Sequence, residues 1–129
     1  AADTVVSLNS EILGKPKNRD EAFLMIKKLQ GKTHTVYTGT TIQQNDIVKN
    51  FVCATEVTFS QLDDELIWTY VNSGEGDDKA GAYALQGIAS MLIEKVNGSV
   101  STVIGLPICE VRECLKEFGI VPKVLNAKK

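Results

Sequence analysis

Lysine lies beside or close to glycine in three short stretches of the 129-residue chain: LGKPK, QGKTH and DDKAG. An ammonium group on a small-residue loop can neutralise a phosphate, so each stretch is a candidate anion site. The widespread phosphate-binding loop also needs a glycine five positions before its Gly-Lys pair. In QGKTH that position is Ile26, which excludes this loop.

Lys15 has the context best suited to a ligand. Gly14 and Pro16 flank it, which makes its loop stiff and lets a ligand approach the backbone closely. Lys17 and Lys32 are expected to be exposed surface charges, as most lysines are.

Acidic residues gather in two places. Residues 63–65 (DDE) fall in the expected first turn of a helix, where negative charge is favoured by the helix dipole. The second cluster lies in GEGDDKAG, residues 74–81, which leads into AYALQG. There Gln86 presents a donor and acceptors suited to reading a nucleobase. A surface turn with a packed Tyr83 is the alternative interpretation.

The histidine and the cysteines do not form a metal-binding pattern. His34 has no second ligand at suitable spacing and lies in a Thr-rich strand pattern, which favours a structural or solvated role. Cys53, Cys109 and Cys114 are odd in number and lack paired spacing, which favours reduced thiols in a cytoplasmic protein. We expect these cysteines to behave as small buried hydrophobic side chains.

The composition is that of an ordinary globular domain spanning residues 1–129. Apolar residues make up 43% and charged residues 23% of the chain. The net charge of -2 provides no basic surface for DNA or RNA. No stretch approaches the roughly 18 apolar residues of a membrane span. We therefore expect neither a nucleic-acid polymer nor a membrane as a partner.

The elements that must position the candidate residues alternate between strands and helices. DTVVSL, THTVYTGTTI and FVCATEVTF are β-branched runs typical of strands, and QQNDIVKN is a hairpin-like connection between the last two. Capping spacings of Asn18 with Glu21, and of Ser60 with Asp63, predict two helices. The first covers about 19–30, and the second, which also packs Trp68 and Tyr70, ends near Asn72.

The last third of the chain predicts a hairpin and a helix. SMLIEKV and STVIGL flank Asn97-Gly98, which is typical of a tight turn, although ALQGIASMLIEKV also fits a helix. Pro107 should begin a final helix that Gly119 ends. Together the elements predict an α/β (α+β) fold with a mixed β-sheet and flanking helices.

The segments ADTVV, ILGKP, GKTHTVYTG, VTF, YVNSGEGDDKAGAYALQG and VIGLP, in that order, closely resemble the Maf proteins. These are nucleoside triphosphate pyrophosphatases related in fold to the inosine triphosphatases. The resemblance covers residues 1 to about 115. It implies a Maf/inosine triphosphatase-like fold and hydrolysis of dTTP or UTP to the monophosphate and pyrophosphate. It also implies a divalent cation, Mg²⁺ or Mn²⁺, and a homodimer.

The resemblance also implies roles for individual residues. Asp3 matches the catalytic acidic residue, which would activate the attacking water, hold the metal, or do both. Thr4 and Gln86 match positions that choose the base. Lys15 matches a lysine near the phosphates, and Lys79 matches a phosphate or structural contact.

Maf proteins place a strand with an S-x-S-P-R-R type motif, and then another acidic residue, before the ADT segment. Neither occurs in these 129 residues. We therefore expect the domain to be N-terminally incomplete. The alternative functions are a catalytically impaired nucleotide-binding or interaction protein, and a small α/β structural module whose loops are only solvated turns.

Overall fold

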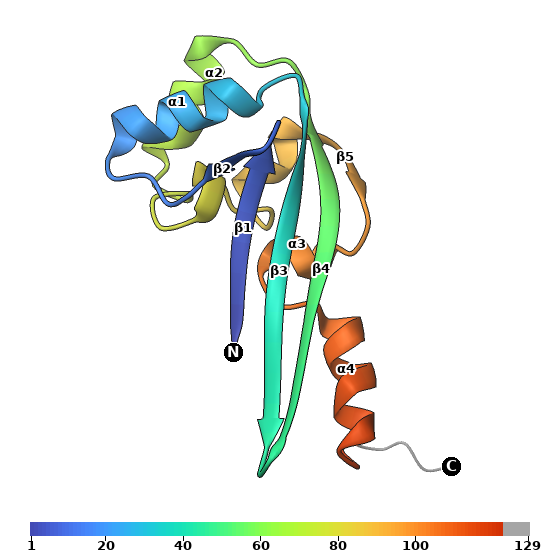
Figure 1. Ribbon diagram of the computed structural model, residues 1–129. Coiled ribbons are helices and arrows are strands. Elements are labelled where there is room, and N and C mark those ends of the chain that lie inside the picture. The colour runs from blue at the N-terminus through green and yellow to red at the C-terminus, as the bar shows by residue number, and fades with distance from the viewer. Residues whose placement is uncertain (123–129) are drawn as a thin grey trace.

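The computed structural model describes residues 1–122, which form helices around one five-stranded sheet (Figure 1). The elements in chain order are β1 (Ala2–Leu8), β2 (Glu11–Leu13), α1 (Arg19–Leu29), β3 (Thr33–Gln44), β4 (Ile47–Phe59), α2 (Asp64–Asn72), the 3-10 turns η1 (Ala80–Ala82) and η2 (Ile88–Leu92), β5 (Ile93–Asn97), α3 (Val100–Ile104) and α4 (Ile108–Glu117). This arrangement confirms the predicted α/β class with flanking helices.

The strand order is β2-β1-β3-β4-β5, and all four pairings within residues 1–122 are antiparallel. The mixed sheet expected from the sequence is therefore replaced by an antiparallel one. Tight turns explain two of the pairings, because Asn9 and Ser10 connect β1 to β2 and residues 45–46 connect β3 to β4. Such short connections allow only antiparallel neighbours.

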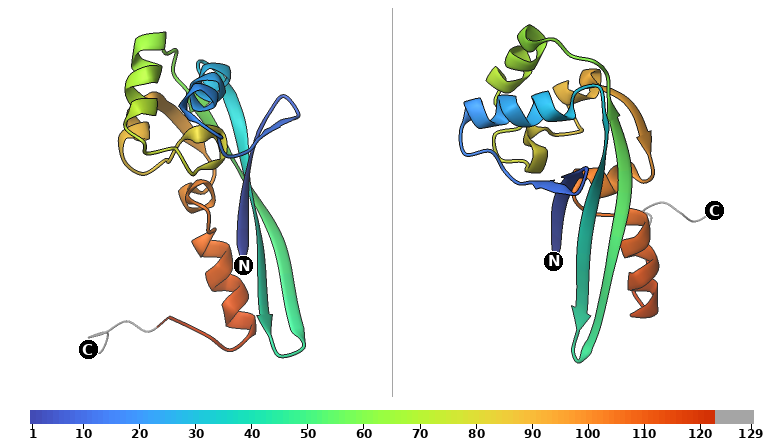
Figure 2. Two further views of the ribbon diagram at one scale, coloured as in Figure 1. Left: turned by 90° about the vertical axis from the view of Figure 1, so that its left-hand side faces the viewer. Right: turned by 45° about the horizontal axis from the view of Figure 1, so that its top comes forward.

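Alternation along the strands buries one face of the sheet. On β4, Thr55, Val57 and Phe59 are buried while the residues between them are more exposed, as the sequence predicted. The buried face packs against α1 and α2, and Figure 2 shows α2, α3 and α4 on one side of the β3–β4 ribbon. Burying each large apolar side chain in this core contributes about 2 kcal/mol.

Helices α1 and α2 pack against each other through aromatic rings. Phe23 of α1 stacks on Trp68 of α2 with ring centroids 4.4 Å apart, and Tyr70 is fully buried. This confirms the packing interpretation of Trp68 and Tyr70. Because both rings face neighbouring elements, neither is placed to stack on a base.

The predicted cap of the first helix is confirmed and that of the second is displaced. Asn18 accepts a 2.8 Å hydrogen bond from the amide of Glu21. In α2 the cap is Asp63, which accepts from the amide of Leu66 at 2.8 Å, so the cap lies three residues after the predicted Ser60. Ser60 instead bonds to the carbonyl of Leu92, because it continues the end of β4 toward β5.

One predicted connection is confirmed with a shorter turn, and one is wrong. β3 and β4 form the expected hairpin, but QQNDIVKN is strand at both ends and only residues 45–46 turn. Residues 93–97 do form a strand, but β5 pairs with β4, and residues 100–104 are helical. Gly98 turns the chain inward, because it has a φ of 130° and lies so close to Thr55 that a Cβ would be 2.8 Å from its Oγ1.

The cysteines are unpaired, but only Cys114 is buried. Cys53 is half-buried and Cys109 is exposed, which corrects the expectation of three buried side chains. Exposure follows from position, since Cys109 lies in the first turn of α4. Within residues 1–122 no helix is long and apolar enough to cross a bilayer.

Candidate active site

A pocket of about 220 Å³ opens beside the N-terminal half of β1. Its lining comes from separate parts of the chain: Ala2, Asp3, Thr4, Val6, Lys15, Val36, Asp78, Lys79, Ala80, Tyr83, Val103 and Ile104. Four of the five residues that the resemblance singled out therefore lie around one pocket. The lining thus includes two acidic residues, Asp3 and Asp78, and two lysines, Lys15 and Lys79.

Asp3 lies on an open edge of the sheet. The backbones of Ala1 and Thr41 exchange two 2.8 Å hydrogen bonds, so the antiparallel alternation turns the Thr4 amide away from β3. On that side β2 pairs only from Val6 onward. The Asp3 Oδ1 accepts the Thr4 amide at 3.0 Å, which leaves an exposed carboxylate able to reach a water or a cation.

Thr4 points to the inner face of the sheet, opposite Thr38 of β3. The pair is a non-hydrogen-bonded pair of the ladder, in which side chains come closest, and the two Oγ1 atoms are 3.0 Å apart. Thr38 also donates a 2.7 Å hydrogen bond to the carbonyl of Thr102. The hydroxyl of Thr4 is thus connected through β3 to α3, whose Val103 and Ile104 form a wall of the pocket.

The two lysines come from loops that are bonded to each other. The amide of Gly81 donates to the carbonyl of Gly14 at 3.0 Å, next to Lys15. Lys79 lies two residues before Gly81, and its ammonium is 3.3 Å from the carboxylate of Asp78. Both lysines are exposed and line the pocket, so a polyanion bound there is within the range of their charges.

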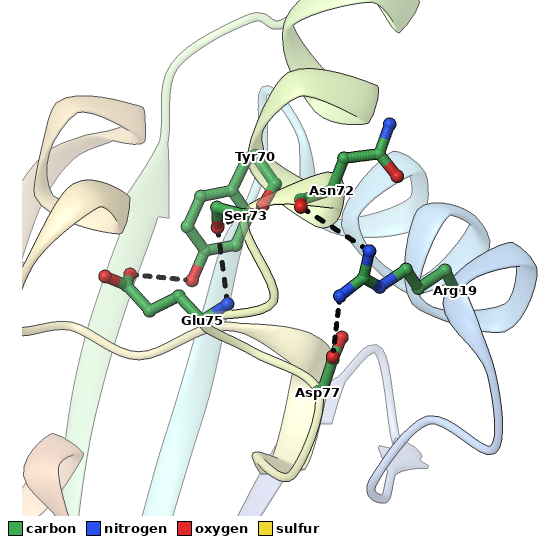
Figure 3. A network of polar contacts seen from close by, with 6 residues as sticks. All are labelled: Arg19, Tyr70, Asn72, Ser73, Glu75 and Asp77. Carbon is green, nitrogen blue, oxygen red and sulfur yellow. Dashed lines mark hydrogen bonds and ion pairs between the residues drawn. The ribbon is translucent and has the colours of Figure 1, made fainter.

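Glu75 fixes the loop that follows α2. Its Oε1 accepts from the hydroxyl of Tyr70 at 2.9 Å (Figure 3) and from the amide of Ala89 at 3.0 Å, and its Oε2 accepts from Ile88 at 2.8 Å. Burial favours the neutral acid, but these three donors outweigh it and hold the pKa of Glu75 below its ordinary value. Gly87 suits this position, since its φ is 98° and an added Cβ would overlap Oε2 of Glu75.

Arg19 tethers the same loop to α1. Its guanidinium lies 3.2 Å from the carboxylate of Asp77 and 3.5 Å from the carbonyl of Asn72 (Figure 3). Both charged groups are about half exposed, so the ion pair contributes little by itself. Together with Glu75 it holds both sides of the segment that carries Asp78 and Lys79.

Gln86 lies apart from the pocket lining. It is exposed in the turn between η1 and η2, one residue before Gly87. Its position along the chain is set by the bonds that Glu75 accepts from Ile88 and Ala89. The structure thus brings together Asp3, Thr4, Lys15 and Lys79, but does not place Gln86 with them.

His34 supports the pocket from behind. Its Nε2 is 2.7 Å from the hydroxyl of Tyr83, and its Nδ1 has no partner among the described residues. Burial lowers the pKa of His34 to about 4, so the ring is neutral at neutral pH. This confirms the structural role that the sequence favoured.

Residues 1–122 contain no cluster of three or more His, Cys, Asp or Glu side chains arranged to hold a metal ion. The pocket does hold two carboxylates, Asp3 and Asp78. Mg²⁺ commonly keeps several waters and is bound by one or two carboxylates together with substrate phosphates. The donor set therefore fits a hydrated cation that arrives with a polyphosphate.

Sequence reasoning missed several parts of this site. Asp78 was visible only as a member of an acidic cluster, although its neighbour Lys79 was a candidate. Thr38 and the α3 residues Val103 and Ile104 gave no signal, because their position depends on strand register and on the inward turn at Gly98.

Comparison with known proteins identifies the family of the chain. The model of the family described as Maf-like protein matches residues 1–118. A dTTP/UTP pyrophosphatase of Thermoanaerobacter sp. (strain X514) is 49% identical over 123 residues, covering 92% of this chain and 64% of the relative. The dTTP/UTP pyrophosphatase of Caldanaerobacter subterraneus subsp. tengcongensis is 48% identical over 123 residues, covering 93% of this chain and 59% of the relative.

A third relative, the dTTP/UTP pyrophosphatase of Acholeplasma laidlawii, is 48% identical over 123 residues, covering 95% of this chain and 65% of its own length. The chain thus spans 59–65% of the length of these three relatives. Because the family model matches nearly all of the described residues, this chain belongs to the Maf family.

Proposed function

We propose that this chain carries the activity of a nucleoside triphosphate pyrophosphatase that acts on dTTP and UTP. The observation that carries the proposal is the convergence of Asp3, Asp78, Lys15 and Lys79 on one pocket in a Maf-family chain. The names of the relatives support the choice of dTTP and UTP.

In the proposed reaction a water molecule attacks the α-phosphorus of the triphosphate. Asp3 takes a proton from that water as the new P–O bond forms, and the bond from the α-phosphorus to the bridging oxygen breaks. The products are the nucleoside monophosphate and pyrophosphate, which keeps the bridging oxygen. Lys15 and Lys79 would stabilise the charge that develops on the leaving pyrophosphate.

We propose Mg²⁺ or Mn²⁺ as the cofactor, held by Asp3 with Asp78 as a second carboxylate. A bound divalent cation would screen the polyphosphate and stabilise negative charge in the transition state. Asp3 can serve both as a metal ligand and as the base only if one carboxylate oxygen binds the cation and the other takes the proton. Its Oδ1 also accepts a hydrogen bond from the Thr4 amide. Titrating activity with each metal, and measuring Mn²⁺ binding to wild type and to Asp78→Asn without nucleotide, tests the assignment.

Pyrophosphate release from a panel of nucleoside triphosphates tests the main proposal. The full natural chain should favour dTTP and UTP, and Asp3→Asn should lose roughly 10²–10⁴-fold in rate, the usual contribution of a general base. Glu94→Gln is the matched control, because Glu94 is an exposed carboxylate on β5 outside the pocket. Unchanged activity in Asp3→Asn would remove that residue from the mechanism.

The alternative, a nucleotide-binding protein with impaired catalysis, makes a different prediction. A nucleotide would then raise the melting temperature without being hydrolysed, since a ligand at 100 times its dissociation constant stabilises by about 2.7 kcal/mol. The homodimer and the cytoplasmic location stay predictions from the sequence. Light scattering at several protein concentrations and cell fractionation would test them.

A further inference from the structure

Three threonine residues connect the pocket to the core. Thr4 lines the pocket and Thr38 is fully buried behind it. The backbone carbonyl of Thr102 is the last acceptor in this series of hydrogen bonds. The two Oγ1 atoms of Thr4 and Thr38 are 3.0 Å apart, and the Oγ1 of Thr38 is 2.7 Å from the carbonyl oxygen of Thr102.

The carbonyl of Thr102 determines which hydroxyl is the donor in each hydrogen bond of this series. A carbonyl oxygen can only accept, so Thr38 must donate its single hydroxyl proton to Thr102. Thr38 then has no proton left for Thr4. The proton between the two hydroxyls must come from Thr4, which donates to Thr38.

Thr4 therefore presents only acceptor lone pairs to a ligand in the pocket. A ligand group that donates a hydrogen bond can therefore bind to the Thr4 oxygen. A ligand group that offers only a lone pair is repelled by it. The apolar side chains of Val103 and Ile104 line the same pocket. A ligand that covers Thr4 displaces water from its hydroxyl, so a polar group left unpaired there is costly.

We infer that Thr38 is a specificity-determining residue that holds Thr4 as a hydrogen-bond acceptor for the imide N3–H of uracil or thymine. The inference rests on the proposed function, which supplies the nucleotide. Cytosine carries a lone pair at the same ring nitrogen, so it meets the lone pairs of Thr4. The hydroxyl chain thereby disfavours a pyrimidine of nearly the same size.

Thr38→Val tests the inference, because it removes the hydroxyl and keeps the shape of the side chain. The Thr4 hydroxyl is then free to rotate and can donate to cytosine as well as accept from uracil. The ratio of kcat/KM for UTP to that for CTP should fall roughly tenfold, which is the scale of one buried hydrogen bond. Thr38→Ser retains the hydroxyl and should restore most of the ratio.

Thr40→Val is the matched control. Thr40 lies two residues along the same strand and is also buried, but its Oγ1 has no hydrogen-bond partner among the described residues. Removing that hydroxyl should leave the UTP to CTP ratio unchanged. Circular dichroism and thermal unfolding of each variant of the full natural chain would show whether it is folded.

The outcomes separate the inference from the proposed function. If Thr38→Val lowers kcat/KM for both nucleotides by the same factor, Thr38 is only structural and the inference is wrong. If the wild type hydrolyses neither nucleotide, the proposed function fails. Binding of UMP and CMP, measured by calorimetry, then gives a separate readout: an equal affinity for both in the wild type overturns the inference too.

Discussion

The amide of Gly81 donates a 3.0 Å hydrogen bond to the carbonyl of Gly14, and this bond joins the two loops that carry Lys15 and Lys79. Gly81 also packs against Val6 of β1, two residues from Thr4. One glycine thus sets the separation between the lysine loops and the strand that carries Asp3. The position of the lysine side of the pocket therefore depends on this contact.

Gly81→Ala should destabilise the protein by about 1–2 kcal/mol, because an L-residue is strained at its φ of 74°. The added Cβ would also lie 3.1 Å from Val6 Cγ2, which forces the loops away from the strand. Urea unfolding measures the loss of stability. The KM for the triphosphate should rise as well, since the lysine loops move.

Gly119→Ala separates backbone strain from steric crowding as causes of the lost stability. Gly119 has a φ of 79°, but a Cβ added there would meet no atom within 4 Å, so only the backbone strain applies. Its cost should be about 1 kcal/mol, with KM unchanged. Equal effects of the two substitutions on both stability and KM would contradict the crowding argument.

Lys15→Met should raise KM for the triphosphate and lower kcat, because it removes a positive charge from the pocket while keeping an unbranched chain. A loss of roughly tenfold or more in kcat/KM is the size expected for one charged hydrogen bond. Lys17→Met is the control, since Lys17 is exposed in the same loop but does not line the pocket. Similar steady-state constants for the two variants would remove Lys15 from the site.

Local signals explain what could be predicted from the sequence. Three predicted features depend only on neighbouring residues, and the structure confirms all of them. They are the cap at Asn18, the alternation along β4 and the end of the last helix at Gly119. Asn97-Gly98 also carries a strong local turn signal. There the packing of Gly98 on Thr55 and the pairing of β5 with β4 override the predicted hairpin.

The candidate site was predictable only in part, for the same reason. Motif resemblance points to Asp3, and the Gly14-Lys15-Pro16 context also points to Lys15, but their shared pocket results from strand register and from the bond between Gly81 and Gly14. The proton order through Thr38 depends on the carbonyl of Thr102, which is 64 residues away in the sequence. No local pattern carries such information.

Glu75→Gln should reduce stability most at neutral pH. Glu75 has a pKa below its ordinary value of 4.5, so its contribution is present above that pH and is lost as pH falls through the lowered pKa. The glutamine also turns an amide donor toward backbone donors that need an acceptor. The difference in unfolding free energy between wild type and variant should therefore shrink below pH 4.5.

Urea unfolding of both proteins between neutral pH and the most acidic pH at which they fold would measure this difference. Glu94→Gln provides the comparison, because its carboxylate is exposed on β5 and lacks these donors. A gap for Glu75→Gln that stays constant across the range would show that its carboxylate gains nothing from the three donors.

His34 should make the folded state sensitive to mild acid. Its folded-state pKa of about 4 lies below the ordinary value of 6.5, so the unfolded chain binds a proton more readily between these pH values. The contribution of the neutral His34 ring to the free energy of unfolding is fully present above pH 6.5. It falls as pH drops toward 4, by about 3 kcal/mol at most. His34→Gln should abolish this part of the pH dependence, because its amide accepts from the Tyr83 hydroxyl and does not titrate.

The measurement is the difference between the unfolding free energies of wild type and variant at about pH 7 and about pH 4.5, on either side of the unfolded-state titration. Parallel stability curves over that interval would mean that His34 is protonated at no cost in the folded protein, and that its buried ring is better solvated than its contacts with Tyr83 and Phe59 indicate.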